Sequence, residues 1–257
     1  MKQSFLLLAA SGFLLLTSCV KYTPGGLPDR ELKLCPILTL EAKDTIDPTN
    51  PDLQFQFTVH YNTAGNPVDM LLTAGDPYSI VDYHFRYDKF NRLTDYIQNY
   101  TGSVGALIWH RYSYPAKKLV IDSVFNYGNA LITDPAPDPS DFPYAIIYTL
   151  DDEGRIVKEQ APGSSPSIIQ YDARGNRILA GVTYDNKINP YRTNPVWQLV
   201  YKDFSANNPL TPPRTGPVEY NVVGLPLVIK GGPYLFDHSF YTELHLDYAC
   251  DAGGKGR

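Results

Sequence analysis

Apolar and polar residues alternate along several stretches of this chain. Between Leu53 and Tyr61 every second residue is apolar, with Gln, Thr and His in between, and the runs 81–88 and 240–250 largely follow the same rule. Successive side chains of a strand point to opposite faces, so this alternation predicts antiparallel strands with one face in the core and one in water.

Helical periodicity is not sustained anywhere after residue 18, so few or no helices are expected in the mature chain. In the run from Val196 to Tyr201, Trp197 and Leu199 occupy alternate positions, which we interpret as a strand with Trp197 packed within the sheet. Composition agrees, because the twenty tyrosines and eleven phenylalanines are residues that fit a pleated, half-buried surface.

A turn pattern recurs at the ends of these runs. An aromatic residue, replaced by Leu150 in one copy, is followed by Asp or Asn, then after two more residues by Gly or Asn, and an apolar residue soon restarts the next run. The Asp or Asn side chain can bond the main chain of the turn, and Gly or Asn accepts a positive φ. Each copy therefore predicts a β-hairpin. The defining positions are Tyr61 and Gly65, Tyr87 and Asn91, Gly154, Tyr171 with Asp172 and Gly175, and Tyr220 with Gly224.

At these positions the chain resembles YD-repeat proteins of the Rhs type, and more closely the small YD-like lipoproteins of Bacteroidota. The resemblance extends over residues 53–249. It implies an all-β fold, an antiparallel meander of hairpin repeats forming a large twisted sheet that curls toward a barrel or shell. A bare repeat array implies no catalytic residues. Convergence is the alternative interpretation, because tyrosine-rich hairpins favour these turn residues in any case.

The N-terminus reads as a secretory signal over residues 1–18. Lys2 precedes an apolar segment that is shorter than the roughly 20 residues needed to span a bilayer. The segment ending in Cys19 resembles bacterial lipoprotein signals, which implies cleavage before Cys19 and lipidation of its thiol. An ordinary secretory peptide with an incidental cysteine is the alternative.

Three further segments are expected after cleavage. Residues 19–30 are predicted to be a lipidated flexible tether, residues 31–250 a single all-β repeat domain, and residues 251–257 a disordered tail. Val20 follows the cysteine in place of Asp, which by resemblance to lipoprotein sorting favours the outer membrane over the inner one. The pattern leaves open whether the domain faces the periplasm or the medium.

The charge of the chain argues against nucleic-acid binding. Removing residues 1–18 takes away one positive charge, that of Lys2, and moves the formal net charge from -5 to -6. No Lys/Arg run is longer than Lys117-Lys118. Nucleic-acid binding needs clustered cations that displace counterions, so the expected partners are the membrane, through the lipid, and a protein or glycan.

Lipidation of Cys19 leaves two cysteines, Cys35 and Cys250, near the first and last predicted strands. Disulfides persist outside the cytoplasm, so we predict a bridge between them. Two buried free thiols are the alternative, because free cysteine is also commonly buried.

Motifs for chemistry are weak. The sequence contains no Gly-x-Ser-x-Gly, no His-Glu-x-x-His and no P-loop, and no catalytic residue or cofactor is assigned. Glu243, His245 and Asp247 share one face of a strand, but a closed metal site needs ligands from other strands as well, so no metal is predicted. Asp122-Ser123-Val124 resembles a short O-glycosylation sequon, as does Asp44-Thr45-Ile46.

Aromatic residues that could stack on sugar rings are the remaining candidate ligand contacts, namely Trp109, Tyr184 and Tyr191. The expected function is a non-enzymatic scaffold or binding module of the cell envelope. The alternative is a surface lipoprotein that binds or hydrolyses glycans, with carboxylates brought together from separate strands.

Overall fold

The computed structural model describes residues 35–43, 54–75, 81–100, 105–129, 136–138, 143–210, 217–230 and 242–251. The predicted signal peptide and the tether with Cys19 lie outside the described residues, as does the sequon at residues 44–46. Of the predicted tail, residues 251–257, only Asp251 is described. Among the described residues, no helix is long and apolar enough to cross a membrane.

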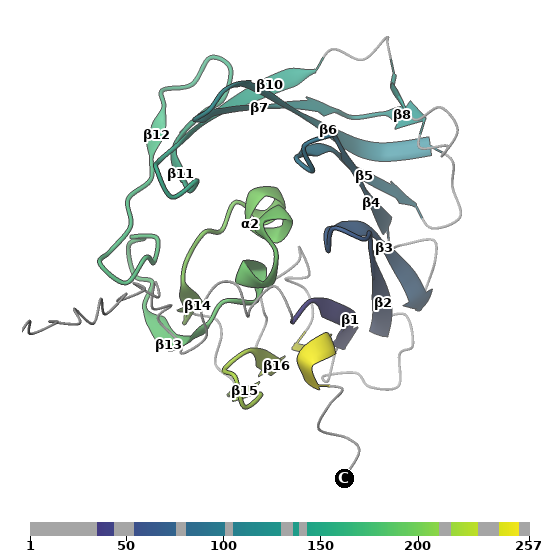
Figure 1. Cartoon of the computed structure of the whole chain (residues 1–257), viewed down its shortest axis with the longest axis vertical. Helices are drawn as coiled ribbons and strands as arrows, with labels where there is room; N and C mark the ends of the chain where they lie inside the picture. Colours follow the sequence, from purple (N-terminus) through teal and green to yellow (C-terminus); the bar gives the residue numbers. More distant parts are fainter. Residues whose placement is uncertain are drawn as a thin grey trace, which may run out of the picture.

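One antiparallel sheet dominates the described part of the chain. Its main path runs β12-β11-β10-β7-β6-β5-β4-β3-β2-β1-β17-β16-β15, and the short strands β8 and β9 extend it beside β6. The sheet curls into an open arc (Figure 1). The predicted all-β class, the antiparallel meander and the curling of a large sheet are confirmed. The strands of the arc are β1 (Ile37–Lys43), β2 (Gln54–Tyr61), β3 (Pro67–Ala74), β4 (Val81–Tyr87), β5 (Leu93–Tyr100), β6 (Gly105–Ala116), β7 (Leu119–Phe125), β8 (Gly128–Asn129), β9 (Ala136–Pro137), β10 (Tyr144–Leu150), β11 (Ile156–Gln160), β12 (Ser167–Ile168), β15 (Val218–Tyr220), β16 (Pro226–Lys230) and β17 (Glu243–Tyr248).

The first and last described strands, β1 and β17, are neighbours inside the sheet, two strands from its β15 end. β1 pairs with β2 on one side and with β17 on the other. The last described residues form η3 (Ala249–Asp251), and Cys250 is joined to Cys35 by a disulfide with a Cα–Cα distance of 4.8 Å. The first and last strands are therefore held together both by main-chain pairing and by a covalent bond.

The inside of the arc is filled by a segment of the same chain, residues 184–209, which we call the plug. It contains β13 (Tyr184–Ile188), η2 (Pro190–Thr193), α2 (Pro195–Tyr201) and β14 (Asn207–Pro209), and α2 lies within the curve of the sheet (Figure 1). Trp197 of α2 is fully buried and meets Phe85 of β4 edge to face, with ring centroids 5.4 Å apart. The concave side of the sheet and the plug thus share one hydrophobic core.

The prediction of a strand at residues 196–201 is wrong, because these residues form α2. Asn194 caps the helix by accepting a hydrogen bond from the Val196 amide, Pro195 occupies the first turn, and Lys202 ends it in the left-handed conformation with φ 54°. Asn followed by Pro is a helix-start signal. In so short an apolar run, alternation and helical spacing cannot be told apart, and a helix enclosed by a sheet is apolar on most sides.

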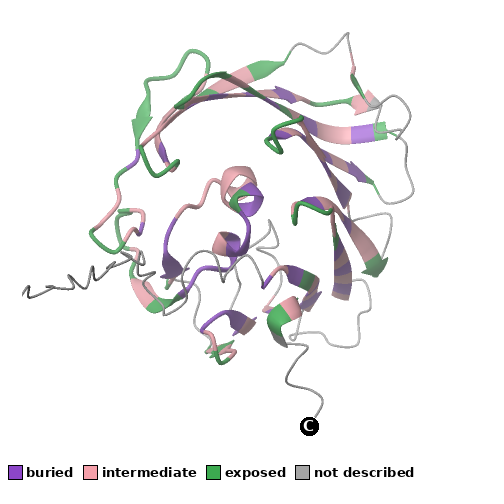
Figure 2. Cartoon of the chain, viewed as in Figure 1, coloured by how far each residue is buried: buried purple, intermediate pink, exposed green. Residues whose placement is uncertain are grey.

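The hairpin tips share one geometry. The Asp or Asn that opens each tip accepts main-chain N–H groups through its side chain, as Asp88 does from Phe90 and Arg92. Equivalent bonds are made by Asn62, Asp151, Asp172 and Asn221. Figure 2 shows exposed residues gathered at such turns and buried ones along the strands. The residue three positions after the Asp or Asn has a positive φ in every case, namely Gly65, Asn91, Gly154, Gly175 and Gly224.

The tyrosines of the repeats link one hairpin to the next. Tyr87, the last residue of β4, donates its hydroxyl to the carbonyl oxygen of Pro67, the first residue of β3, over 2.5 Å. A tyrosine at the end of one strand thus supplies a hydrogen-bond donor to a main-chain carbonyl at the start of another strand. We call this contact the tyrosine latch. Within the described residues it recurs as Tyr61 to Ile37, Tyr114 to Leu93, Tyr171 to Ile156 and Tyr248 to Pro226.

Candidate functional site

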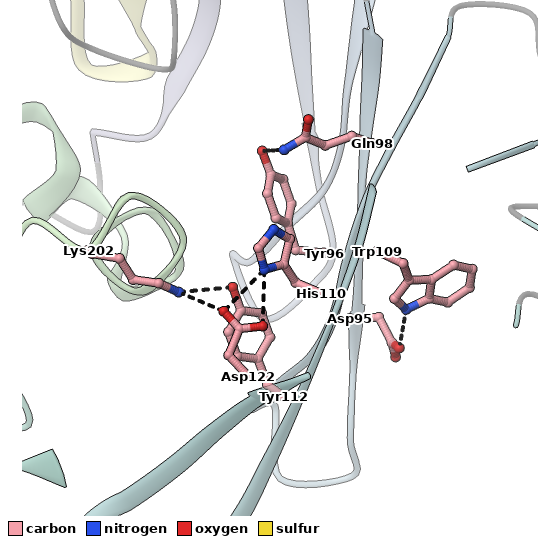
Figure 3. A network of polar contacts seen from close by, with 8 residues as sticks. All are labelled: Asp95, Tyr96, Gln98, Trp109, His110, Tyr112, Asp122 and Lys202. Carbon is pink, nitrogen blue, oxygen red and sulfur yellow. Dashed lines mark hydrogen bonds and ion pairs between the residues drawn. The ribbon is translucent and has the colours of Figure 1, made fainter. Parts of the chain in front are cut away.

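A group of polar side chains lies between the concave face of the sheet and the plug (Figure 3). His110 and Tyr112 come from β6, Asp122 from β7, and Lys202 from the turn that ends α2. Asp122 pairs across the strands with Tyr112, so both face inward with their neighbours Val120 and Val124. We call His110, Tyr112, Asp122 and Lys202 the interior polar cluster.

The carboxylate of Asp122 is the centre of this cluster and is fully buried. His110 Nδ1 lies 3.0 Å and 3.1 Å from its two oxygens, and Lys202 Nζ lies 3.2 Å from Oδ2. The Lys202 ammonium also donates to the Tyr112 hydroxyl over 3.2 Å. Lys202 Nζ lies 4.7 Å from the centroid of the Tyr148 ring as well, so aromatic faces and a carboxylate surround the cation.

The electrostatics of the cluster follow from this burial. Burial raises the pKa of the Asp122 carboxyl, but the His110 hydrogen bond and the Lys202 charge outweigh it and hold the pKa below its usual range. Burial lowers the pKa of the Lys202 ammonium, which the charges of Asp122 and Glu159 oppose. Burial, together with the Asp122 charge, raises the pKa of the Tyr112 hydroxyl well above its usual value. The cluster is therefore a buried ion pair surrounded by neutral phenols.

This arrangement can do two things chemically. A buried carboxylate costs several kcal/mol unless it is paired, so Asp122 fixes the end of α2 against β6 and β7 through Lys202. A carboxylate can also orient an imidazole as a general base, and His110 retains 21% of its side-chain exposure. The aromatic rings beside His110 are Tyr96 and Tyr112, with centroids 5.5 Å and 6.3 Å away.

Trp109 does not offer a sugar-binding face. It is fully buried on the other side of β6, and its indole N–H donates to Asp95 over 2.7 Å, as Arg111 does over 2.8 Å. The strand β8 covers its ring so closely that a Cβ on Gly128 would lie 2.8 Å from it. The prediction that Trp109 contacts a ligand is wrong. Its ring is buried together with Ile97 in a second, small hydrophobic core.

The two tyrosines predicted as ligand contacts differ in exposure. Tyr191 is buried and stacks on Tyr201 with ring centroids 4.9 Å apart, so the prediction is wrong for Tyr191 because the plug packs inside the sheet. Tyr184 is half-buried and donates its hydroxyl to the Arg177 carbonyl over 2.7 Å. It links β13 to the preceding hairpin in the manner of a tyrosine latch.

The acidic and histidine residues of β17 have separate partners. His245 Nε2 lies 2.6 Å from a Glu243 oxygen, whereas Asp247 accepts from the Thr39 hydroxyl of β1 over 2.8 Å. Across the described ranges, no group of three or more His, Cys, Asp or Glu side chains is placed to hold a metal ion. Ser123 of the remaining sequon lies inside β7, between β6 and β10.

The structure brings Cys35 and Cys250 together and gives the repeat-turn residues equivalent places, but sequence reasoning missed the interior polar cluster. One signal was present in the sequence: Asp122 lies between Val120 and Val124 on what alternation makes an apolar face. A carboxylate in such a position requires a buried partner. Its partner Lys202 lies 80 residues further along the chain, so spacing could not identify it.

Comparison with known protein families and with curated proteins finds no match to this chain.

Proposed function

We propose that the protein is an outer-membrane-anchored lipoprotein of the cell envelope that acts as a non-enzymatic scaffold or binding module. The observation that carries this proposal is the filled interior. The plug occupies the concave side of the sheet. The Asp122 carboxylate, at the centre of the interior polar cluster, contacts His110 and Lys202 of the same chain. The surfaces offered to a partner are therefore the convex face, the sheet edges and the hairpin tips.

The repeat geometry supports a scaffold role. Tyrosine latches join consecutive hairpins, and the disulfide joins the first strand to the last. A rigid frame with variable turns is a common way to present binding residues. The exposed middle residues differ from tip to tip, as Lys89-Phe90, Asp152-Glu153 and Val222 illustrate.

We also propose that the chain is a YD-repeat protein of the kind its turns resemble. The support is structural equivalence of the tips, in which an Asp or Asn bonds the turn and the third residue after it has positive φ. At three tips the preceding tyrosine, Tyr61, Tyr87 or Tyr171, supplies the latch, which gives a physical reason for an aromatic residue at that position.

The anchor is tested by intact mass spectrometry of the protein purified from bacterial envelopes. We expect a mature chain that begins at Cys19 and carries acyl groups, and that stays with membranes after a high-salt wash. A Cys19→Ala variant should lose both properties. A cleaved chain without acyl mass would contradict the proposal.

The binding role is tested by affinity capture from envelope extracts, with a glycan array run in parallel on the same protein. A protein partner captured by the parent chain and lost on substitution of tip residues would support the scaffold. Specific glycan binding would favour the alternative function instead.

Glycan binding or hydrolysis is the alternative, and one observation favours it. The charges of Asp122 and Glu159 both act on the Tyr148 hydroxyl, whose pKa is raised by burial and by these two carboxylates. Glu159 pairs with Tyr148 across β10 and β11, so its side chain shares the sheet face of Asp122, and a glycosidase uses two carboxylates that face one site. The test is hydrolysis of a glycan panel by the parent chain, Glu159→Gln and Lys158→Gln, the last as control. Activity lost only in Glu159→Gln would establish the alternative.

A further inference from the structure

The hairpin tips lie at one end of the strands, and the described chain begins at the same end. Tyr61 is the last residue before the first tip, and its hydroxyl bonds the carbonyl of Ile37, two residues after Cys35. Tyr248, which ends β17 beside Cys250, bonds Pro226, the residue that follows another tip. The described chain therefore begins, at Cys35, among the tips.

The tip nearest to this point, Asn62 to Asn66, is polar and carries no charge, and the tips on either side of it are apolar or basic. Phe90 is 66% exposed at the tip between β4 and β5, with Lys89 Nζ at 5.1 Å and the Arg92 guanidinium at 5.3 Å from its ring centroid. The next tip along the sheet presents Lys117 and Lys118. On the other side of β1 and β17, the tip between β15 and β16 presents a fully exposed Val222.

Negative charge lies mainly outside this stretch of the edge. The Asp88 carboxylate at the Phe90 tip is 2.7 Å from the Arg92 guanidinium. The strongly acidic tip, Asp151 to Glu153, comes after the lysine tip in sheet order, where Asp152 is 2.6 Å from Lys118 Nζ. From the Val222 tip to Lys117, these tips thus combine the exposed apolar side chains of Phe90 and Val222 with more basic than acidic residues, although Arg92 itself is paired with Asp88.

We propose that this stretch of hairpin tips, the basic-apolar rim (Lys89, Phe90, Arg92, Lys117 and Val222), docks on an anionic phospholipid bilayer. This inference rests on the proposed lipoprotein function for its tether. Phe90 enters the headgroup region while the adjacent cations contact lipid phosphates, a combination that binds membrane interfaces. In this orientation the hairpin tips contact the membrane, and the convex face of the sheet is directed away from the plug and is not covered by the bilayer.

The length of the tether is consistent with this orientation. Sixteen residue steps separate Cys19 from Cys35, which allows at most about 55 Å when extended. A lipid anchor keeps the rim near the bilayer at a high effective concentration, so even a weak rim contact would be populated. The basic-apolar rim therefore determines how the domain is oriented on the bilayer, and the lipid on Cys19 keeps the domain attached to it.

The test separates the rim from the lipid. The chain from residue 19, carrying Cys19→Ser so that it cannot be acylated, is sedimented with vesicles of equal parts phosphatidylglycerol and phosphatidylcholine, and with phosphatidylcholine alone. We expect binding to the anionic vesicles only, weakened by salt. Phe90→Ser should weaken binding about tenfold, and Lys89→Gln about fivefold, the effect of one cation near an anionic surface.

The matched apolar control is Ile168→Ser, because Ile168 is 65% exposed but lies on the edge strand β12. The matched cation control is Lys158→Gln in β11. Equal weakening by Phe90→Ser and Ile168→Ser would overturn the proposal, as would no binding of the parent chain to phosphatidylglycerol. A Phe90→Trp variant adds a direct readout, since its fluorescence should be quenched by brominated lipid. Failure of acylation at Cys19, read from intact mass, would refute the anchor independently of these results.

Discussion

The hydroxyl of Tyr87 and the main-chain carbonyl of Pro67 form a 2.5 Å hydrogen bond across 20 residues, and they do so at the edge where two hairpins meet. The same contact is made by the repeat tyrosines Tyr61, Tyr114 and Tyr171. Tyr220 differs, because its hydroxyl donates to the Asp185 carboxylate. Arg92 adds to one of them by packing its guanidinium 4.5 Å from the Tyr114 ring centroid. The repeat is therefore a unit of inter-hairpin bonding as well as of turn formation.

Removing one tyrosine latch should lower the free energy of unfolding by a measurable amount. Tyr87→Phe deletes the hydroxyl and leaves the Pro67 carbonyl without its donor, which should cost about 1 to 2 kcal/mol of unfolding free energy. Urea denaturation followed by circular dichroism measures this. Tyr100→Phe is the control, since Tyr100 is an exposed strand-end tyrosine and its change should be close to neutral. Equal effects of the two substitutions would argue against the latch.

Breaking the interior polar cluster should be costly, and removing both charges less so. Asp122→Asn leaves the Lys202 ammonium without its carboxylate, and we expect a loss of about 3 to 5 kcal/mol. The double variant Asp122→Asn with Lys202→Met should recover part of that loss, because no unpaired charge remains. A double-mutant cycle in urea measures the coupling. Additive single effects would mean that the two residues do not stabilise each other.

The lowered pKa of Asp122 predicts an acid-dependent loss of stability. As pH falls below about 4, this carboxyl becomes protonated in the unfolded chain while the folded one stays ionised. The unfolded state then binds more protons, so stability present at neutral pH decreases until pH passes the folded pKa. Thermal unfolding from pH 7 to pH 2.5 should show a smaller decrease for Asp122→Asn than for the parent. Parallel curves would contradict this contribution.

The disulfide should stabilise the meeting of β1 and β17. Its cysteines are 215 residues apart, and loss of such a cross-link typically costs about 2 to 4 kcal/mol. A Cys35→Ser, Cys250→Ser double variant should therefore unfold at a lower urea concentration than the oxidised parent. The reduced parent should match the double variant. Labelling of both cysteines in the unreduced, denatured parent would show that the bond does not form.

Local sequence was enough to predict much of the fold. The alternation from Phe55 to Val59 gives buried residues at every second position of β2, as expected. The turn residues follow the same local logic, because an Asp or Asn and a residue with positive φ make the tip without help from distant parts of the chain. Asn91 illustrates this, since it takes φ 59° where the other tips have glycine.

Contacts between distant segments explain what the sequence could not predict. Trp109 lies in β6, and its burial depends on β8 passing over it. Tyr191 and Trp197 are enclosed because the chain returns inside its own sheet. A half-buried strand and a buried helical turn have the same apolar composition over seven residues, so only packing could decide between them.

By itself the sequence determined strand periodicity and turn chemistry, because side-chain direction and Asp, Asn or Gly conformations act over a few residues. Tertiary structure decided which polar groups meet. Lys202 reaches Asp122 from 80 residues away and Tyr112 from 90, through a left-handed turn at the end of a helix that forms inside the curved sheet. Burial makes that meeting necessary, since a carboxylate removed from water remains charged only beside a partner.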